Sequence, residues 1–272
     1  DGQEYVTIPA GTFWMGCVPG DTTCDEDELP RRRVTISRPF RMARTETTVR
    51  VFRRFVEETG YRPASERTGS GWGQGERDLA WVKGLSWKTP LRVGERAPGD
   101  WPVTQVSWGD ALAFCRWAGG TLPTEAQAEY VRHRSADWVY PWGPVVDWAV
   151  DENLADEEQR AAAGGWAFYR GYDDGFAEIA PVGSYPPDAR GLHDLAGNVT
   201  EWCLDWYGAA WYSEAPAVDP GGPASGRVRC IRGGSFRTSP NDPRVSARGW
   251  NPPGGRYLDV GFRCVLPVSA DE

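Results

Sequence analysis

The residues best suited to chemistry lie in one stretch, positions 191–206. It holds two glycines, an asparagine, three acidic residues and two tryptophans, a mixture that neither an amphipathic helix nor a regular strand requires. We therefore predict a tight, buried loop. Asp194 and Glu201 supply carboxylates, and Gly197 and Val199 can turn main-chain carbonyls inward, which together make the oxygen-rich pocket that Ca²⁺ prefers. The alternative is a capped turn whose acids face water.

Strands and helices must position this loop. Alternation at 5–8 and at 33–37 predicts strands, and 13–15 should continue the same sheet. Apolar residues spaced three and four apart after Thr48 predict a helix that is capped by Thr48 and ends near Gly60. Ser107 and Thr124 each precede a further helical pattern, with Asp or Gln three residues later, which is typical of a capping box.

Two segments show no sustained period. The charge run at 25–33 is predicted to be a solvated crossing loop. Positions 61–101 combine many glycines and charges with scattered tryptophans, which predicts an irregular insert over the core. Trp72, Trp81 and Trp87 could line a cleft there, or they could be ordinary core aromatics.

Composition restricts the class of protein. The 272 residues have a formal net charge of -8 and an isoelectric point near 5.0. Nucleic-acid binding is not expected, because phosphate recognition needs a basic face. No apolar run is long enough to span a membrane. The chain begins at Asp1 without a methionine, so we expect a mature secreted or periplasmic protein whose signal peptide has been removed.

Seven further motifs accompany the sequence Gly-Leu-His-Asp-Leu-Ala-Gly-Asn-Val-Thr-Glu-Trp at 191–202. They are Ile-Pro-Ala-Gly-Thr-Phe-Trp-Met-Gly (8–16), Thr-Glu-Thr-Thr (45–48), Pro-Val-Thr-Gln-Val-Ser-Trp (102–108), Leu-Pro-Thr-Glu (122–125), Pro-Trp-Gly (141–143), Arg-Gly-Gly-Ser (232–235) and Gly-Phe-Arg (261–263). In this order they resemble the sulfatase-modifying-factor family, whose founding member is the formylglycine-generating enzyme. The resemblance implies a single α+β domain over 1–272, an elaborated C-type-lectin-like fold with short sheets, few helices and long loops.

The resemblance also implies one or two structural Ca²⁺ ions. One would lie in the loop described above, on Asp194, Gly197, Val199 and Glu201. The other set of ligands implied by the match is Asn153, Leu154, Asp174 and Phe176, with side chains from the asparagine and the aspartate and main-chain carbonyls from the other two. Without the resemblance, Asp174 and the glycine after it would be interpreted as a turn.

The six cysteines form an even number, which indicates an oxidising compartment, although sequence alone cannot choose their pairing. By resemblance, Cys115–Cys264 matches a disulfide of secreted family members. Cys17–Cys24 could close a small loop, which leaves Cys203–Cys230 as the third pair and no free thiol. The alternative is a set of buried cytosolic thiols.

The sequence lacks the metal-binding residues that the resemblance implies for the known enzymes of the family. Formylglycine generation, by resemblance, uses copper on two cysteines shortly after the Gly-Gly-Ser motif, and 233–248 contains no cysteine. We therefore expect no copper. A second branch uses iron on three histidines, but only His133 and His193 exist, and each is predicted to be structural. Ser235 has no evident histidine partner and no Gly-x-Ser-x-Gly elbow.

The leading hypothesis is therefore a calcium-stabilised binding or accessory module, predicted to be a monomer, that recognises a peptide, protein or glycan through its C-terminal face. The side chains expected to be exposed on that face have the composition of binding hot spots. They are Arg237, Arg244, Arg248, Trp250, Asn251, Arg256 and Tyr257. Alternatively, Arg244 and Arg248 support the core. The rival hypothesis for the whole chain is an oxidoreductase or maturation enzyme of the same family that acts on a peptide or natural product.

Overall fold

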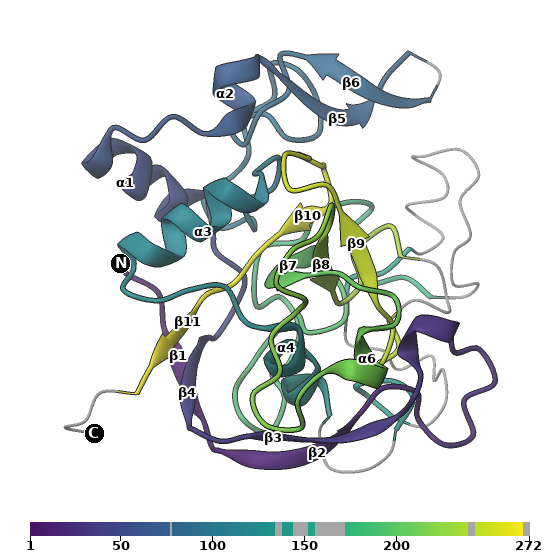
Figure 1. Cartoon of the computed structure of the whole chain (residues 1–272). Coiled ribbons are helices and arrows are strands. Elements are labelled where there is room, and N and C mark those ends of the chain that lie inside the picture. Colours follow the sequence, from purple (N-terminus) through teal and green to yellow (C-terminus); the bar gives the residue numbers. More distant parts are fainter. Residues whose placement is uncertain (77, 134–137, 144–151, 156–171, 239–242, 269–272) are drawn as a thin grey trace.

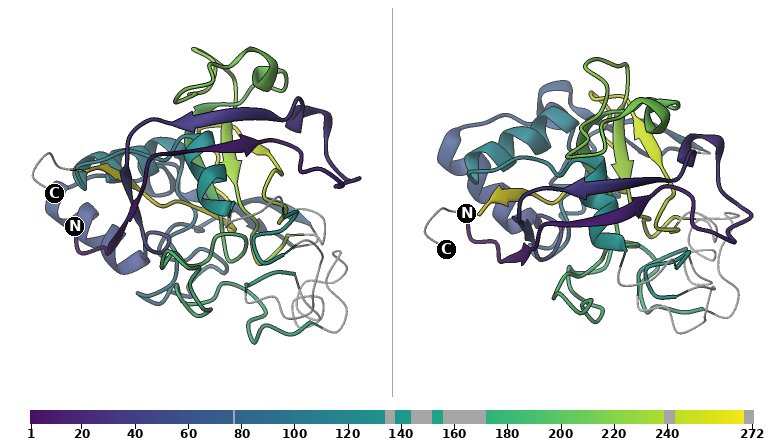
Figure 2. Two further views of the ribbon diagram at one scale, coloured as in Figure 1. Left: turned by 90° about the horizontal axis from the view of Figure 1, so that it is seen from below. Right: turned by 60° about the horizontal axis from the view of Figure 1, so that its bottom comes forward.

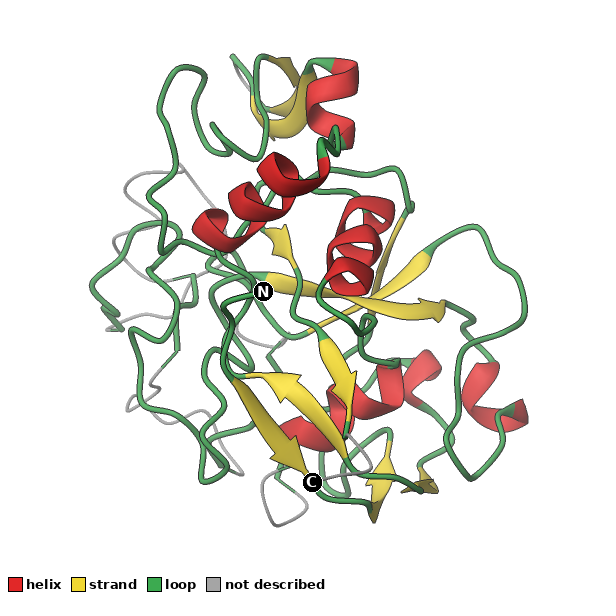
Figure 3. Cartoon of the chain, turned by 90° about the vertical axis from the view of Figure 1, so that its left-hand side faces the viewer, coloured by secondary structure: helices red, strands yellow, loops and turns green. Residues whose placement is uncertain are grey.

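The computed structural model of the chain describes residues 1–76, 78–133, 138–143, 152–155, 172–238 and 243–268. Short strands and helices are joined by long loops (Figure 3). This is the α+β architecture with little regular secondary structure that the sequence predicts. Among the described residues, no helix has the length and apolar character needed to cross a bilayer.

A three-stranded antiparallel sheet brings the two ends of the chain together. Its central strand β4 (Phe40–Ala43) pairs with β1 (Tyr5–Ile8) on one side and with β11 (Val265–Pro267) on the other. Strands β2 (Gly11–Met15) and β3 (Arg32–Ile36) form a separate ribbon, so the expectation that 13–15 continue the first sheet is wrong. Figure 2 shows this ribbon running along one side of the molecule.

A four-stranded sheet contains the second half of the 191–206 stretch. Its order is β10 (Val260–Gly261), β7 (Thr200–Trp206), β8 (Arg229–Arg232) and β9 (Gly249–Asn251). Strand β7 pairs in parallel with β10 and antiparallel with β8, and the β7–β8 register shifts between Trp202 and Trp206. The loop at 191–199 therefore leads directly into a central strand.

The three predicted helices are confirmed with their caps. They are α1 (Val49–Thr59), α3 (Trp108–Trp117) and α4 (Glu125–Arg132). The side chains of Thr48, Ser107 and Thr124 accept hydrogen bonds from main-chain N–H groups of the first turn, which otherwise lack helical partners. Two short helical turns are η1 (Glu26–Glu28) and α6 (Trp211–Glu214).

The segment at 61–101 is more regular than its sequence predicts. Helix α2 (Ala64–Thr68) is followed by an antiparallel hairpin of β5 (Ser70–Gln74) and β6 (Leu79–Lys83). Figure 1 shows this unit above helix α3, at the top of the molecule. The glycines that obscure the alternation are required by packing, because a Cβ on Gly71 would lie 2.1 Å from the Gln105 side chain.

The main core lies between helices α1 and α3 and the four-stranded sheet. Phe52, Phe114, Trp87, Trp202 and Phe262 are fully buried in it. Phe114 stacks against Phe52, with ring centroids 5.8 Å apart, and meets Phe262 edge-on. Trp87 is therefore a core aromatic, whereas the Trp81 side chain is 49% exposed.

The disulfide predictions are confirmed for two pairs and wrong for the third. Cys17–Cys24 and Cys115–Cys264 are bonded, and the latter ties helix α3 to the end of the chain. Cys203 and Cys230 are free, buried thiols. They lie on neighbouring strands, but Cys203 follows Trp202, where the register shifts, and the Cys230 thiol is directed at Glu125, with Sγ and Oε2 3.4 Å apart.

Candidate functional site

The loop at 191–199 has the tight, buried form that its composition predicts. Asp194 and Asn198 adopt left-handed backbone conformations, with φ of 54° and 62°. Gly197 lies so close to the main chain of Asn153 that a Cβ would approach the Asn153 carbonyl oxygen to 2.4 Å. Main-chain Asn198 N–H also donates to that carbonyl at 2.8 Å. The loop is thereby held against the segment that contains the other predicted calcium ligands.

Three buried carboxyl groups gather around this loop. Asp194 and Glu201 are 4% and 3% exposed, and Glu46, from the turn before helix α1, is fully buried. Two buried arginines approach the group, and Arg132 Nη2 lies 4.0 Å from Glu201 Oε2. Arg263 Nε donates to Glu201 Oε1 at 2.6 Å, and its Nη2 donates to the main-chain carbonyls of His193 and Asp194 at 2.9 Å.

This group has more negative charge and more acceptor oxygens than the protein satisfies. Neither carboxyl oxygen of Glu46 has a hydrogen-bond partner among the described residues, nor does Oδ1 of Asp194. Burial raises the pKa of Glu46 well above its ordinary value, and repulsion by Asp194 adds to this. Unpaired buried carboxylates are costly, so the arrangement fits a bound cation with oxygen ligands.

The second predicted set of ligands is also partly unsatisfied. Asn153 is fully buried, and its Oδ1 has no hydrogen-bond partner among the described residues. Its Nδ2 donates to the Glu178 carbonyl at 2.8 Å, which fixes the direction of the amide. The Asp174 carboxylate accepts from the N–H groups of Leu154 and Phe176 at 3.0 and 2.9 Å. The structure therefore brings Leu154, Asp174 and Phe176 into contact next to Asn153, whose amide oxygen is unpaired.

The sequence did not indicate that Glu46 belongs to this group of carboxyl groups. Glu46 lies in the Thr-Glu-Thr-Thr motif at 45–48, about 150 residues before the other acids, in a segment interpreted only as a helix cap. An acid two residues before an N-cap threonine is common at a surface, so the residue type did not indicate burial. Only the fold places this carboxyl beside Asp194.

The segment after Gly-Gly-Ser is held by hydroxyl groups and contains no sulfur. Gly233 has φ of 84° and lies against the Arg132 guanidinium. The hydroxyl of Thr238 accepts from the Ser235 N–H group at 2.5 Å, and Ser235 Oγ donates to Asp259 Oδ2 at 3.4 Å. Positions 239–242 lie outside the described residues, and the sequence has no cysteine there.

The two free thiols lie away from solvent. Cys203 and Cys230 are fully buried, and burial, followed by nearby carboxylates, raises the pKa of each well above its ordinary value. A thiol with a raised pKa stays protonated, whereas the thiolate is the form that binds Cu(I). The two thiols are therefore poor replacements for a copper pair.

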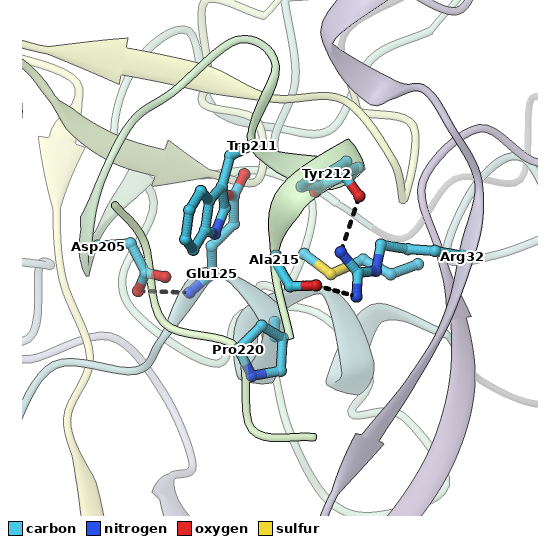
Figure 4. Close-up of a pocket in the computed structure, with 9 residues that line it drawn as sticks. Arg32, Glu125, Asp205, Trp211, Tyr212, Ala215 and Pro220 are labelled. Carbon is cyan, nitrogen blue, oxygen red and sulfur yellow. Dashed lines mark hydrogen bonds between the residues drawn. The ribbon is translucent and has the colours of Figure 1, made fainter. Parts of the chain in front are cut away.

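A small hollow lies beside the thiols, at the start of helix α4 (Figure 4). Asp205 Oδ2 accepts from the Glu125 N–H group at 2.9 Å, and Arg32 donates to the main-chain carbonyls of Tyr212 and Ala215. The hollow measures about 10 Å³, room for one water molecule at most. Burial raises the pKa of Asp205 to about 7. We assign this hollow no ligand.

Two of the residues expected on the C-terminal face are buried in ion pairs. Arg244 donates to both carboxylate oxygens of Glu28, at 2.8 and 2.6 Å, and its side chain is 3% exposed. Arg248 does the same with Glu125, and its side chain is fully buried. Their predicted exposure is wrong, and the alternative that they support the core is confirmed. Glu28, from the charge run expected to be solvated, is buried.

The remaining five residues do not form one face. Trp250 and Asn251 lie in β9, at one edge of the four-stranded sheet, where Trp250 is 52% exposed. Arg256 and Tyr257 approach the opposite edge, next to the β5–β6 hairpin, where Tyr257 forms a bridge with Trp72.

Arg256 is buried rather than exposed. It stacks on Trp81 with its guanidinium carbon 4.5 Å from the ring centroid, and it donates to main-chain carbonyls of Ser70 and Gly254. Arg237 pairs with Asp259 at 3.7 Å, and its side chain is 11% exposed. The exposed part of this edge is therefore aromatic: Trp81, with half-buried Trp72 and Tyr257 beside it.

Comparison with known proteins identifies the family of this chain. Residues 1–268 match the model of the sulfatase-modifying factor enzyme 1-like domain. The chain belongs to that family. It is 36% identical to the formylglycine-generating enzyme of Streptomyces coelicolor over 286 residues, which cover 96% of this chain and 88% of the relative. It is also 31% identical to the inactive C-alpha-formylglycine-generating enzyme 2 of Bos taurus, over 96% and 87% of the two chains.

Solved structures support the same fold. PvdO from Pseudomonas aeruginosa superimposes with a TM-score of 0.76 at 23% identity, over 98% of this chain and 95% of the other. The Treponema denticola variable protein 1 superimposes with a TM-score of 0.60, also at 23% identity, over 97% and 95% of the two chains. The fold of the family is thus shared by chains with little sequence in common.

The two histidines of this family member, expected to be structural, each contact neighbouring residues of the fold. His193 Nδ1 lies 2.8 Å from the carbonyl oxygen of Tyr185. The His133 ring packs against Phe13 at 5.5 Å, with Nε2 3.5 Å from Glu129 Oε1. His193 thus has a polar contact within the fold, whereas Nε2 of His133 is buried without a hydrogen-bond partner among the described residues.

Proposed function

We propose that this chain is an exported, calcium-stabilised binding or accessory domain of the family, which recognises a peptide, protein or glycan and does not generate formylglycine. The observation that favours this function is the position and the bonding state of the cysteines. None follows the Gly-Gly-Ser motif before Cys264, which is bonded to Cys115. The two remaining thiols are buried and protonated. A family member named as inactive, at 31% identity, is consistent with loss of chemistry on this fold.

Calcium is proposed because of the unsatisfied oxygens. Asp194, Glu201 and the main-chain carbonyls of Gly197 and Val199 would hold one ion, with Glu46 beside them. Asn153 and Asp174, with the carbonyls of Leu154 and Phe176, would hold the other. Each ion would neutralise buried acceptors that the protein leaves unpaired, which stabilises the loop without a chemical step.

Export is proposed from the two disulfides, because such bonds persist in oxidising compartments. Cys115–Cys264 closes a loop across more than half of the chain, so its formation restricts the unfolded state strongly.

The ligand surface we propose is the aromatic edge at the β5–β6 hairpin. Trp81 and Trp72 meet edge-on with centroids 5.6 Å apart, and the Arg256 stack holds the Trp81 ring in place. Large aromatic side chains held by their neighbours bind a partner with little loss of side-chain entropy, and they dominate binding hot spots. This surface replaces the broader C-terminal face expected from the sequence.

A matched pair of variants tests the surface. Trp81 and Trp14 are equally exposed, at 49%, but Trp14 lies in β2 on the separate ribbon. A phage-displayed peptide library and a glycan array, probed with wild type, Trp81→Ala and Trp14→Ala, should give signals that Trp81→Ala abolishes and Trp14→Ala retains. Signals that are lost equally in both variants would exclude the surface.

The rival function is an oxidation of a peptide or natural product in the same family. The 36% identity with a formylglycine-generating enzyme favours it. Incubation of the purified protein with a cysteine-containing peptide, with copper, with iron and without metal, separates the two functions. A peptide product detected by mass spectrometry under any of these conditions would favour the enzyme.

A further inference from the structure

A second polar hollow lies on a different part of the surface, between helix α1 and the segment at 87–96. It measures about 210 Å³ and is lined by Arg53, Val56, Glu57, Trp87, Lys88 and Arg96. Three of these six side chains are cationic and one is anionic, although the whole chain has a net charge of -8. A locally basic hollow on an acidic protein is unexpected from composition.

The walls of the hollow are fixed by the core. Arg53, Val56 and Glu57 share one face of helix α1, because they are three and four residues apart. Trp87 packs edge-on against Phe52 with ring centroids 5.3 Å apart. The N–H group of Ala97 donates to the Lys88 carbonyl at 2.9 Å, which holds the 88–97 loop closed.

Two of the three cations are not neutralised. The Lys88 ammonium pairs with Glu66 at 2.8 Å and lies over the Trp87 ring. Among the described residues, by contrast, no carboxylate lies within 4.0 Å of Arg53 or Arg96, and no hydrogen bond from either guanidinium is present.

The arginines nearest to them in sequence are paired. Arg54 bonds Glu58 at 2.6 Å, and Arg92 bonds Glu178. Arg54 and Arg92 thus each have an acidic partner. Arg53 and Arg96 instead face the hollow with their donors unused.

We propose that this hollow binds a tetrahedral oxyanion, a sulfate or a phosphate group, either free or as the monoester of a larger molecule. Planar guanidinium groups donate two hydrogen bonds at once to such oxyanions. The half-buried side chain of Val56 would contact the organic part of an ester. Glu57 lies on the same rim and opposes the charge of the ligand. The site shares no residue with the aromatic surface around Trp81, so its presence does not depend on the function proposed above.

Isothermal titration calorimetry tests the site with inorganic phosphate, inorganic sulfate, phenyl phosphate and phenyl sulfate, at low ionic strength. We expect saturable binding of the free ions and of the phenyl esters. The doubly substituted Arg53→Gln, Arg96→Gln protein should bind at least about tenfold more weakly, because two charge-assisted contacts are lost. Glu57→Gln should bind more tightly, because a repulsive charge is removed.

The matched control is Arg116→Gln. Arg116 is an exposed arginine on helix α3 without an ion pair among the described residues, so its loss changes net charge but not the hollow. Thermal unfolding confirms that each variant is folded. Absence of saturable binding in wild type would overturn the proposal. A loss of affinity that Arg116→Gln reproduces would also overturn it, because the effect would then be one of net charge. Equal affinity of the double variant and wild type would likewise exclude these arginines.

Discussion

Arg248 and Glu125 form a buried, two-point ion pair, with Nε and Oε1 2.7 Å apart and Nη2 and Oε2 2.9 Å apart. The side chains are 0% and 3% exposed. The pair joins the segment before β9 to the first turn of helix α4, so the C-terminal part of the chain is attached to the centre of the fold. Arg248, which the sequence predicts to be an exposed binding residue, therefore stabilises the fold instead.

Removal of this arginine should destabilise the protein strongly. Arg248→Gln leaves the Glu125 carboxylate buried without its main partner, which costs about 3–5 kcal/mol in such pairs. Chemical denaturation should measure this loss in the free energy of unfolding. Arg38→Gln, at an exposed arginine without an ion pair among the described residues, should change it by less than about 0.5 kcal/mol. Equal, small effects would indicate that the pair contributes little.

Glu46 should be needed for the response to calcium. Calcium should raise the midpoint of thermal unfolding of wild type above its value in chelator, because the ion binds the folded state. In Glu46→Gln this rise should shrink, since one negative charge beside Asp194 is lost. Glu4→Gln, which removes an exposed carboxylate, should respond as wild type does. No response of wild type to calcium would contradict the proposed metal site.

Asp205 should make stability depend on pH. Its pKa is raised from 3.8 to about 7 in the folded state, so between these values the folded protein binds a proton that the unfolded chain has released. Stability therefore falls as pH rises from about 4 to 7, by up to about 4 kcal/mol from this group, and levels off above pH 7.

Asp205→Asn should remove this part of the slope. Because Glu46 also has a raised pKa, the difference between wild type and variant isolates the contribution of Asp205. Free energies of unfolding measured between pH 4 and 8 provide the comparison. If the free energy of unfolding depends on pH in the same way in wild type and in Asp205→Asn, the contribution of Asp205 is excluded.

The two free thiols should not react with a thiol reagent in the native protein. Cys203 and Cys230 are buried and protonated, so a thiol reagent should label none in the folded state and two under denaturing conditions. Detection of no thiol after denaturation would mean that a third disulfide is present, contrary to this structure.

Local sequence signals predicted the parts of the fold that local physics determines. Thr48, Ser107 and Thr124 cap their helices because a short side chain at that position reaches the free N–H groups of the first turn. Cys17 and Cys24 are close in sequence, so the bridge between them closes only a small loop.

Features of the fold that depend on contacts between residues far apart in the sequence were harder to predict. The Cys203–Cys230 disulfide was expected because these two cysteines remained after the other two pairs were assigned. The number of cysteines contains no information about the register shift in β7. The glycines of the β5–β6 hairpin disguised a strand pair, since they are set by the approach of Gln105 and Leu85. Arg244 and Arg248 have the composition of a binding surface, and only the fold places Glu28 and Glu125 against them.

One experiment on the purified native protein tests both for bound calcium and for copper-dependent oxidation. Bound metals are measured by elemental analysis, and the same sample is incubated with copper and a cysteine-containing peptide, whose aldehyde product is measured by mass spectrometry. We expect bound calcium, no bound copper and no aldehyde. Stoichiometric copper together with an aldehyde product that is lost in Cys203→Ser or Cys230→Ser would contradict this expectation.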